Sequence, residues 1–93
     1  GQTSLHLACI QGDLDLANKY LDEGCNINAK DDEGWTSLHR AALYGHADIV
    51  NELITRNVDV NAYGYLGDTP LHDACYNNHF DIVELLLQNG ADP

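Results

Sequence analysis

The chain has little positive charge. Its 93 residues include four Lys and Arg but 15 Asp and Glu, for a formal net charge of −11 at pH 7, and neither Lys nor Arg follows Arg56. A surface of this kind repels nucleic acid and anionic membranes and attracts basic partners. The composition therefore argues against nucleic-acid or membrane binding and favours a basic protein or peptide as the partner.

The sequence also lacks several segments that would indicate a function directly. It has no apolar run long enough to span a membrane, no signal peptide, no low-complexity tract and no glycine-rich phosphate loop. Its three cysteines form no Cys-x-x-Cys motif. Nothing in the chain therefore indicates a membrane anchor or a nucleotide-binding loop.

What the chain has instead is a period of 33 residues. Thr-Ser-Leu-His at 3–6 recurs at 36–39, and returns as Thr-Pro-Leu-His at 69–72. The units align without insertion or deletion. A fixed period of this length is typical of a stack of repeats, in which function rests on surface contacts rather than on a buried reaction centre. Each unit opens with a glycine: Gly1, Gly34 and Gly67.

Each unit is predicted to form two short helices. Thr36 is a good N-cap for a helix that begins at Ser37, and the same position is held by Thr3 and Thr69. Asp48 suits the positive end of the second helix. Helices of about two turns are too short to be stable alone in water, so burial has to come from stacking. The second helices are predicted to end in the left-handed conformation at Gly24, Asn57 and Gly90.

The third unit carries the fullest motif. Residues 67–72 read Gly-Asp-Thr-Pro-Leu-His, and residues 81–92 read Asp-Ile-Val-Glu-Leu-Leu-Leu-Gln-Asn-Gly-Ala-Asp. This pattern resembles the ankyrin repeat, and the resemblance extends over the whole chain. It implies an all-α repeat solenoid, an ankyrin stack of helix-turn-helix units with β-hairpin fingers at 25–35 and 58–68.

The register divides a single domain, residues 1–93, into three repeats. Repeat 1 spans 1–33, repeat 2 spans 34–66, and repeat 3 spans 67–93 and is truncated. Because both ends look cut relative to the repeat, we expect the chain to be an excerpt of a longer protein.

Five histidines suggest a metal site or a catalytic site, but the 33-residue period argues against both. They occupy only two repeat positions, and the resemblance implies that the first braces the repeat through hydrogen bonds to the capping threonine and the neighbouring backbone. No pair has the i, i+4 spacing of a helical zinc site, and successive repeats lie too far apart to share an ion. We therefore expect no metal, no cofactor and no catalytic residue, and predict that the chain is not an enzyme. The two sets are His6, His39 and His72, and His46 and His79.

The cysteines point to a compartment. Cys9 and Cys75 share a core-facing position that Ala42 holds in repeat 2. We expect both thiols to be buried, free and unreactive, because apolar surroundings raise the pKa of a thiol. Buried free thiols are typical of a reducing compartment, so we expect a cytoplasmic or nuclear protein.

The predicted partner-binding residues are those that break the period. In ankyrin stacks the finger tips and the exposed side of each first helix form a concave groove. Aromatic residues flanked by carboxylates there would bind a basic, partly apolar peptide through buried area, cation–π contacts and charge pairing. The alternative is that Trp35 and Tyr65 pack locally on their own fingers. The candidates are Asp32, Glu33, Trp35, Arg40, Leu43, Tyr44, Tyr65, Leu66, Asp68, Asp73, Tyr76 and Asn77.

Part of the chain is also similar to ankyrin modules of nuclear corepressors and histone-tail readers. The resemblance implies that Trp35, Tyr44 and Asp73 would hold a lysine-rich tail. The chain departs from those readers at Arg40 and Leu43, where they carry Glu and Asn, and a cation at Arg40 would repel a lysine. The matching segments are residues 34–39, 64–65 and 70–74.

Two further functions stay open. In the first, the chain is the regulatory or substrate-recruiting region of a larger enzyme, with catalysis outside these residues. In the second, it is a purely structural part of a longer solenoid. As a domain we expect a monomer that binds another protein or peptide, with no nucleic-acid or membrane partner.

Asn61 carries one more family-level hypothesis. In Asp-Val-Asn-Ala at 59–62 it resembles the asparagine that factor-inhibiting hydroxylases modify in ankyrin repeats. Its ordinary role, a hydrogen bond within the finger, is the favoured interpretation.

Overall fold

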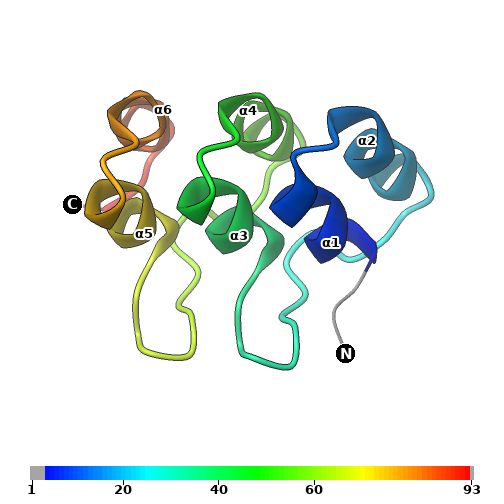
Figure 1. Ribbon diagram of the computed structural model, residues 1–93, viewed down its shortest axis with the longest axis horizontal. Coiled ribbons are helices and arrows are strands. Elements are labelled where there is room, and N and C mark those ends of the chain that lie inside the picture. Colours follow the sequence, from blue (N-terminus) through cyan, green and yellow to red (C-terminus); the bar gives the residue numbers. More distant parts are fainter. Residues whose placement is uncertain (1–3, 93) are drawn as a thin grey trace.

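The computed structural model describes residues 4–92, and these form three consecutive pairs of α-helices (Figure 1). Gly1, the predicted cap Thr3 and the C-terminal Pro93 lie outside the described residues. No helix within 4–92 is both long enough and apolar enough to cross a membrane. The pairs are α1 (Ser4–Gln11) and α2 (Leu14–Asp22), α3 (Ser37–Leu43) and α4 (Ala47–Thr55), and α5 (Pro70–Tyr76) and α6 (Phe80–Gln88).

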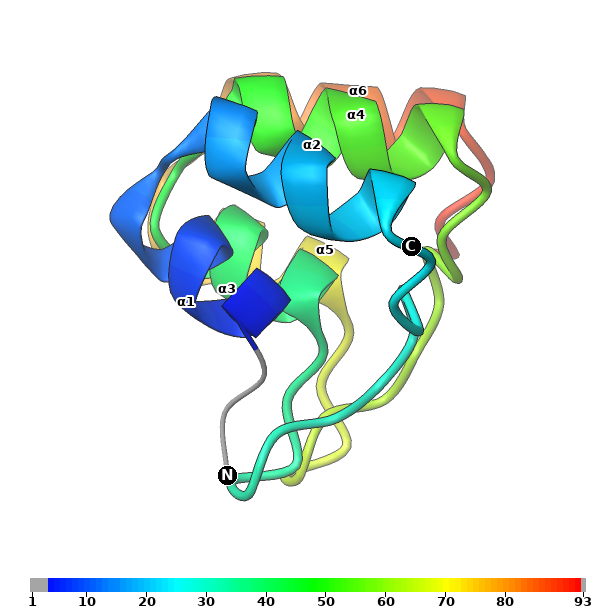
Figure 2. The same cartoon turned by 90° about the vertical axis from the view of Figure 1, so that its right-hand side faces the viewer.

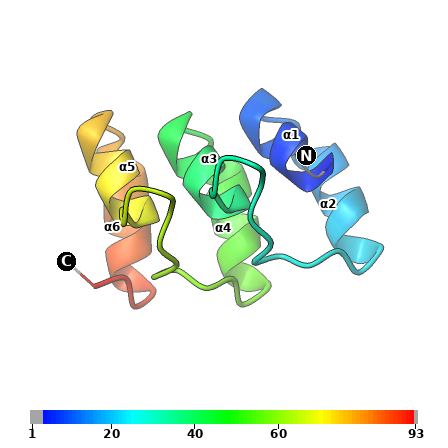
Figure 3. The ribbon, with the colours of Figure 1, turned by 90° about the horizontal axis from the view of Figure 1, so that it is seen from below.

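The helices form two layers. α1, α3 and α5 lie side by side in one layer, and α2, α4 and α6 lie side by side in the other (Figures 1 and 2). The connecting segments, which we call the first finger (25–35) and the second finger (58–68), project from the first layer on the side away from the second. Figure 3 shows the two fingers seen from below, beneath α3 and α5. This arrangement confirms the all-helical repeat stack predicted from the period.

Capping threonines begin the first helix of repeats 2 and 3. The Oγ1 atom of Thr36 accepts a hydrogen bond from His39 N at 3.2 Å, and His39 Nδ1 accepts one from Thr36 N at 3.3 Å. Thr69 and His72 form the same reciprocal box. Two orphan backbone donors are thereby satisfied at each helix start. Pro70 stands at the first helical position, as predicted.

Left-handed residues end the second helices where the sequence predicted them. The φ angles are +86° at Gly24, +64° at Asn57 and +95° at Gly90. Glycine has no Cβ to resist this conformation, and asparagine tolerates it.

The fingers are irregular loops. Within residues 4–92 the predicted β-hairpins are reduced to one isolated antiparallel bridge, between Lys30 and Thr36. Asp31 replaces the missing strand pairing in the first finger, because its Oδ1 atom accepts from the backbone N–H groups of Glu33 and Trp35, each at 3.0 Å. In the second finger, Gly64 N donates to the backbone carbonyl of Asp68 at 2.7 Å.

Histidine rings join the repeats to one another. The first histidine of a repeat reaches forward to the next finger: His6 Nε2 contacts the carbonyl oxygen of Trp35 at 2.8 Å, and His39 Nε2 that of Asp68 at 2.9 Å. The second histidine reaches back to the preceding repeat, since the Nε2 atoms of His46 and His79 contact the carbonyl oxygens of Ile10 and Leu43 at 3.1 and 3.2 Å. The bracing role predicted for the first histidine is therefore confirmed at His39, whereas the contacts of His46 and His79 were not predicted from the sequence.

Asparagines make a third connection between repeats. Asn28 Oδ1 accepts from Asp59 N at 2.9 Å, and Asn61 Oδ1 accepts from Asp92 N at 2.8 Å. Asn61 also donates from Nδ2 to the carbonyl oxygen of Gly90 at 3.1 Å. These bonds tie each finger to the segment one repeat further along.

The core lies between the two layers. Its central side chains come from repeat 2, which is covered on both sides, and each is fully buried. Stacking thus supplies the burial that a single two-helix unit lacks. These residues are Leu38, Ala41, Ala42, Ile49, Val50 and Leu53.

The two core-position cysteines differ. Cys9 is fully buried, and burial raises the pKa of its thiol to about 12. The prediction that Cys75 is buried was wrong, because its thiol lies on the face of repeat 3 that no described residue covers. His72 is exposed on the same repeat. Burial at this repeat position depends on the repeat that follows.

The inter-repeat histidine contacts predict the outcome of two alanine substitutions. An alanine at Gly45 would have φ +79°, with Cβ only 2.7 Å from His79 Cε1, whereas at Gly24 φ is +86° and nothing lies within 4 Å. Gly24→Ala should therefore cost about 1 kcal/mol, the left-handed strain alone. Gly45→Ala should cost about 2–3 kcal/mol in the free energy of unfolding, since ring displacement adds to the strain.

Urea unfolding of the two variants measures this difference. Equal losses would show that the histidine ring moves aside freely and does not hold the repeats together.

Candidate functional site

A hollow of about 520 Å³ opens between the tips of the two fingers. The first finger contributes Asp32, Glu33 and Trp35, and the second contributes Tyr65 and Leu66. All five were among the residues predicted from the sequence. Tyr65 and Leu66 are each 78% exposed, so they are not packed into their own finger. The hollow thus combines carboxylates on one side with large apolar surfaces on the other.

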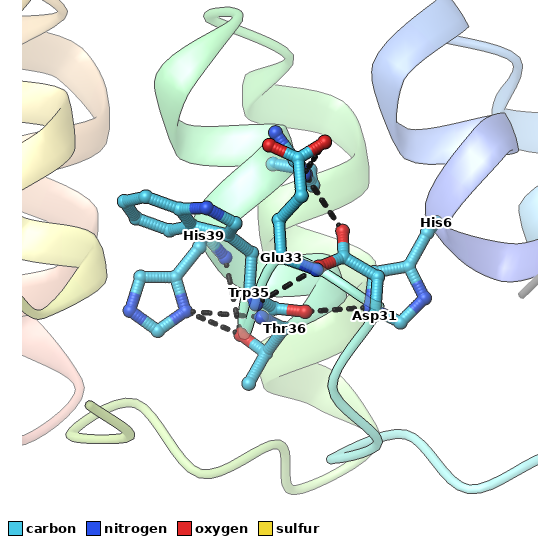
Figure 4. A network of polar contacts seen from close by, with 7 residues as sticks. His6, Asp31, Glu33, Trp35, Thr36 and His39 are labelled. Carbon is cyan, nitrogen blue, oxygen red and sulfur yellow. Dashed lines mark hydrogen bonds and ion pairs between the residues drawn. The ribbon is translucent and has the colours of Figure 1, made fainter. Parts of the chain in front are cut away.

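Arg40, on α3, holds the first finger, which forms one side of this hollow. Its Nε and Nη2 atoms donate to Asp31 Oδ2 at 3.0 and 2.8 Å, and Nη2 lies 3.6 Å from Glu33 Oε1. The guanidinium carbon stands 5.7 Å from the centroid of the Trp35 ring, within cation–π range. Figure 4 shows Asp31, Glu33 and Trp35 gathered in this network.

The prediction that Arg40 faces a partner is not supported by this geometry. Its side chain is only 9% exposed, and its charge is compensated by Asp31. Arg40 therefore fixes the first finger against α3 and holds the Trp35 ring in place. The repulsion of a lysine that the sequence suggested is correspondingly weakened.

Asp31 is a site-building residue that sequence reasoning passed over. The exposed neighbours Asp32 and Glu33 were selected, but Asp31 turns inward and its side chain is fully buried. Burial by itself raises the pKa of Asp31, but hydrogen bonds from Trp35 N, Arg40 and Glu33 N outweigh it, so the pKa lies below its ordinary value. The available signal was the nine-residue separation between Asp31 and Arg40, one of the chain's four Lys and Arg residues.

A second group of carboxylates lies under the second finger. Asp73, on α5, is only 8% exposed, which corrects the prediction that it lines the open groove. Asp68 is half-buried, and within the described residues no hydrogen bond reaches Asp68 Oδ1, Asp68 Oδ2 or Asp73 Oδ2. The two finger–helix junctions therefore differ in charge, although they occupy the same repeat positions.

The repeat register explains the difference. Asp31, Trp35 and Arg40 in the first junction correspond to Gly64, Asp68 and Asp73 in the second. The position of Arg40 is therefore held by Asp73 in the second junction. The position of its acidic partner Asp31 is held by Gly64. The cation that repeat 2 supplies from within is missing from repeat 3.

His39 lies close to the second group, but its nitrogens are engaged. One ligand atom from each of His39, Asp68 and Asp73 falls within 4.8 Å of the others. Nε2 of the ring contacts the carbonyl oxygen of Asp68 at 2.9 Å and Nδ1 contacts Thr36 Oγ1 at 2.7 Å. Binding a metal there would break the repeat-joining bond, so the geometry does not favour a metal centre.

Comparison with known proteins identifies the fold family. A family model for ankyrin repeats, in three copies, matches residues 5–93. The chain belongs to the ankyrin-repeat family. Ankyrin repeats are generally protein–protein interaction modules and are typically non-catalytic.

A curated relative matches part of this ankyrin domain. Tonsoku-like protein of Drosophila melanogaster is 46% identical over 35 residues, which is 38% of this chain and 2% of that protein. The chain thus corresponds to a very small part of that relative's length.

The remaining predicted residues of the ankyrin domain lie at the C-terminal ends of α3 and α5. Tyr44 is 47% exposed and Tyr76 is 87% exposed, while Leu43 is half-buried. Asn77 is exposed and donates from Nδ2 to the carbonyl oxygen of Asp73 at 3.0 Å. None of these four lines the hollow at the finger tips, so the predicted site is divided between two ends of the first-layer helices.

Tyr63 was missed from the sequence. It lies on the second finger two residues before Tyr65 and is 65% exposed. The signal was the second finger's concentration of aromatic residues, which the repeat itself does not require.

The buried ion pair generates a stability prediction. Asp31→Ala leaves the Arg40 guanidinium buried without its partner, and should lower the free energy of unfolding at neutral pH by about 3 kcal/mol. Because the native pKa of Asp31 is depressed, its stabilisation is present above the unfolded value of 3.8 and is lost as pH falls below it. The difference in the free energy of unfolding between wild type and Asp31→Ala should therefore become smaller in acid.

Chemical denaturation across a pH series measures this gap. Glu23→Ala, which removes an exposed carboxylate, is the control and should change stability by less than about 0.5 kcal/mol. A gap that stays constant into acid would mean that the loss comes from packing and not from charge.

Proposed function

We propose that this domain is a monomeric, non-catalytic interaction module that binds a basic, partly apolar peptide or protein surface. The observation that carries the proposal is the hollow between the finger tips, which Asp32, Glu33 and Trp35 line from the first finger and Tyr65 and Leu66 from the second. A ligand that satisfies both sides needs cationic and apolar groups close together. A peptide with Lys or Arg beside an aliphatic residue has this chemistry.

Exposed aromatic surface supports the proposal. Tyr63, Tyr65 and Leu66, all on the second finger, are between 65% and 78% exposed, although the stack does not use them for its own packing. Large exposed apolar side chains gathered at one place indicate an interaction site more often than a solvated surface. Aromatic anchors also supply much of the binding free energy at interfaces.

Charge supports the basic character of the partner. Two of the four cations, Arg40 and Arg56, are already paired with carboxylates, Arg40 with Asp31 and Arg56 with Asp22 and Glu52. The net charge of −11 would therefore steer a basic ligand toward the domain and speed association. Salt should weaken the complex, because exposed charges are screened.

A lysine-rich histone tail is a second candidate ligand. The specific observation in its favour is that Arg40 is neutralised by Asp31, which reduces the repulsion expected from the sequence. Asp68 and Asp73 also retain carboxylate oxygens without donors within residues 4–92. A lysine ammonium is one group that would supply the missing donors.

The groove proposal predicts the effect of removing its aromatic anchors. Tyr65→Ala combined with Leu66→Ala should weaken binding of basic peptides by about tenfold or more, because the apolar side of the hollow is lost. Tyr44→Ala combined with Tyr76→Ala tests whether the helix ends belong to the same site. The measurement is fluorescence anisotropy with a library of basic peptides that includes modified and unmodified histone tails.

The matched control is Phe80→Ala. Phe80 is 64% exposed but begins α6, in the second layer and away from the fingers, so binding should be unchanged. Affinity that is independent of salt, and that survives both double substitutions, would refute the groove. Silence from histone peptides together with binding of other basic peptides would eliminate only the second candidate.

A further inference from the structure

Asp68 and Asp73 form a carboxyl pair at the junction of the second finger with α5. Asp68 precedes the capping Thr69, and Asp73 lies in the first turn of the helix. One carboxylate oxygen of each lies within 4.8 Å of the other, and three of the four oxygens are buried without a hydrogen-bond partner among residues 4–92. Two buried carboxylates this close repel one another when both are ionised, so one proton shared by the pair relieves the repulsion.

The charged groups around the pair do not replace that proton. From α3, Arg40 already donates twice to Asp31 and lies near Glu33, so it offsets the pair only from a distance. His39, also on α3, is held neutral because burial lowers its pKa. Asp73 on α5 and Asp68 on the finger are then left facing one another.

Burial decides how strongly the proton is held. Desolvation, and then the neighbouring carboxyl group of Asp68, raise the pKa of Asp73 to about 8, and Arg40 opposes this only in part. Two interacting carboxyl groups of this kind titrate as one unit. The pair therefore changes charge close to physiological pH.

The position of the second finger depends on Asp68. The backbone carbonyl of Asp68 accepts from Gly64 N at 2.7 Å and contacts His39 Nε2 at 2.9 Å. The turn closed by the first of these bonds carries Tyr65 and Leu66, which line the hollow. A movement of Asp68 would therefore displace Tyr65 and Leu66, the apolar side of the candidate site.

We propose that Asp68 and Asp73 act as a proton-sensitive latch: one shared proton holds the second finger against α5, and its loss moves the finger and with it Tyr65 and Leu66. Without the proton, two adjacent buried negative charges repel one another, and Asp68 on the loop moves more easily than Asp73 on the helix. The latch is a property of the free protein. Its effect on ligand affinity, with a cationic side chain taking the place of the proton, rests on the proposed function.

Trp35 provides a direct probe of the latch. It is the chain's one tryptophan. A Cβ atom built on Gly64 would lie 2.9 Å from Asp68 Oδ1 and 3.0 Å from Trp35 Cζ3, so the carboxylate and the indole flank the same glycine. Ionisation of the pair or movement of the finger should therefore change the tryptophan fluorescence.

The experiment is a pH titration of tryptophan fluorescence on the free protein. Wild type should show a one-proton step with a midpoint near pH 8. Asp73→Asn keeps a hydrogen-bond donor toward Asp68 but cannot ionise, so it should hold the acidic-form signal throughout and show no step. Glu84→Gln, the same chemical change at an exposed position of α6, should retain the step.

A flat wild-type titration, or a step that persists in Asp73→Asn, would overturn the latch. Asp68→Asn repeats the test from the other partner in case Asp73→Asn fails to fold by circular dichroism. No ligand is present in this experiment, so its failure and a failed peptide screen are separate results.

Discussion

The structure depends on the contact between each repeat and its neighbour. Helices of seven to nine residues do not persist alone in water, and each is held by packing across the repeat boundary. Within that packing, the rings of His6 and His39 bond forward to finger carbonyls, and those of His46 and His79 bond back to helix-end carbonyls. These bonds satisfy buried backbone groups that neither repeat could satisfy alone. Fold and finger geometry therefore rest on the same interactions.

The same constraint explains why the fingers differ in electrostatic character. A finger has almost no strand pairing of its own within residues 4–92, so its side chains fix its shape. The first finger is fixed by the Asp31–Arg40 pair, which is charge-balanced and stable at neutral pH. The second is held by the backbone carbonyl of Asp68, which contacts His39 Nε2 and accepts from Gly64 N, and the acidic side chains of Asp68 and Asp73 lie close together beside it. The first junction is therefore charge-balanced, while the second lacks a cation of its own, which is the basis of the latch proposed above.

Sequence reasoning was most successful where a local rule decides the structure. Thr36, Thr69 and Pro70 predicted helix starts, because capping involves residues three positions apart. It was least successful where burial depends on distant segments. Arg40 and Asp73 were predicted to face a partner, yet both are buried at the junction between a finger and its helix. Of the candidate site, Trp35, Tyr65 and Leu66 were found because they break the period at finger positions, whereas Asp31 was hidden within an acidic run.

The sequence by itself determined the repeat length, the starts of the first helices in repeats 2 and 3, the family and the surplus of negative charge, because each follows from local pattern or from composition. Only the tertiary structure decided which carboxylates face solvent. Asp32 and Asp31 are adjacent in the chain, but one reaches the hollow and the other is buried against Arg40. That choice depends on the approach of a helix whose Arg40 lies nine residues away in the chain and gives the buried Asp31 a cationic partner.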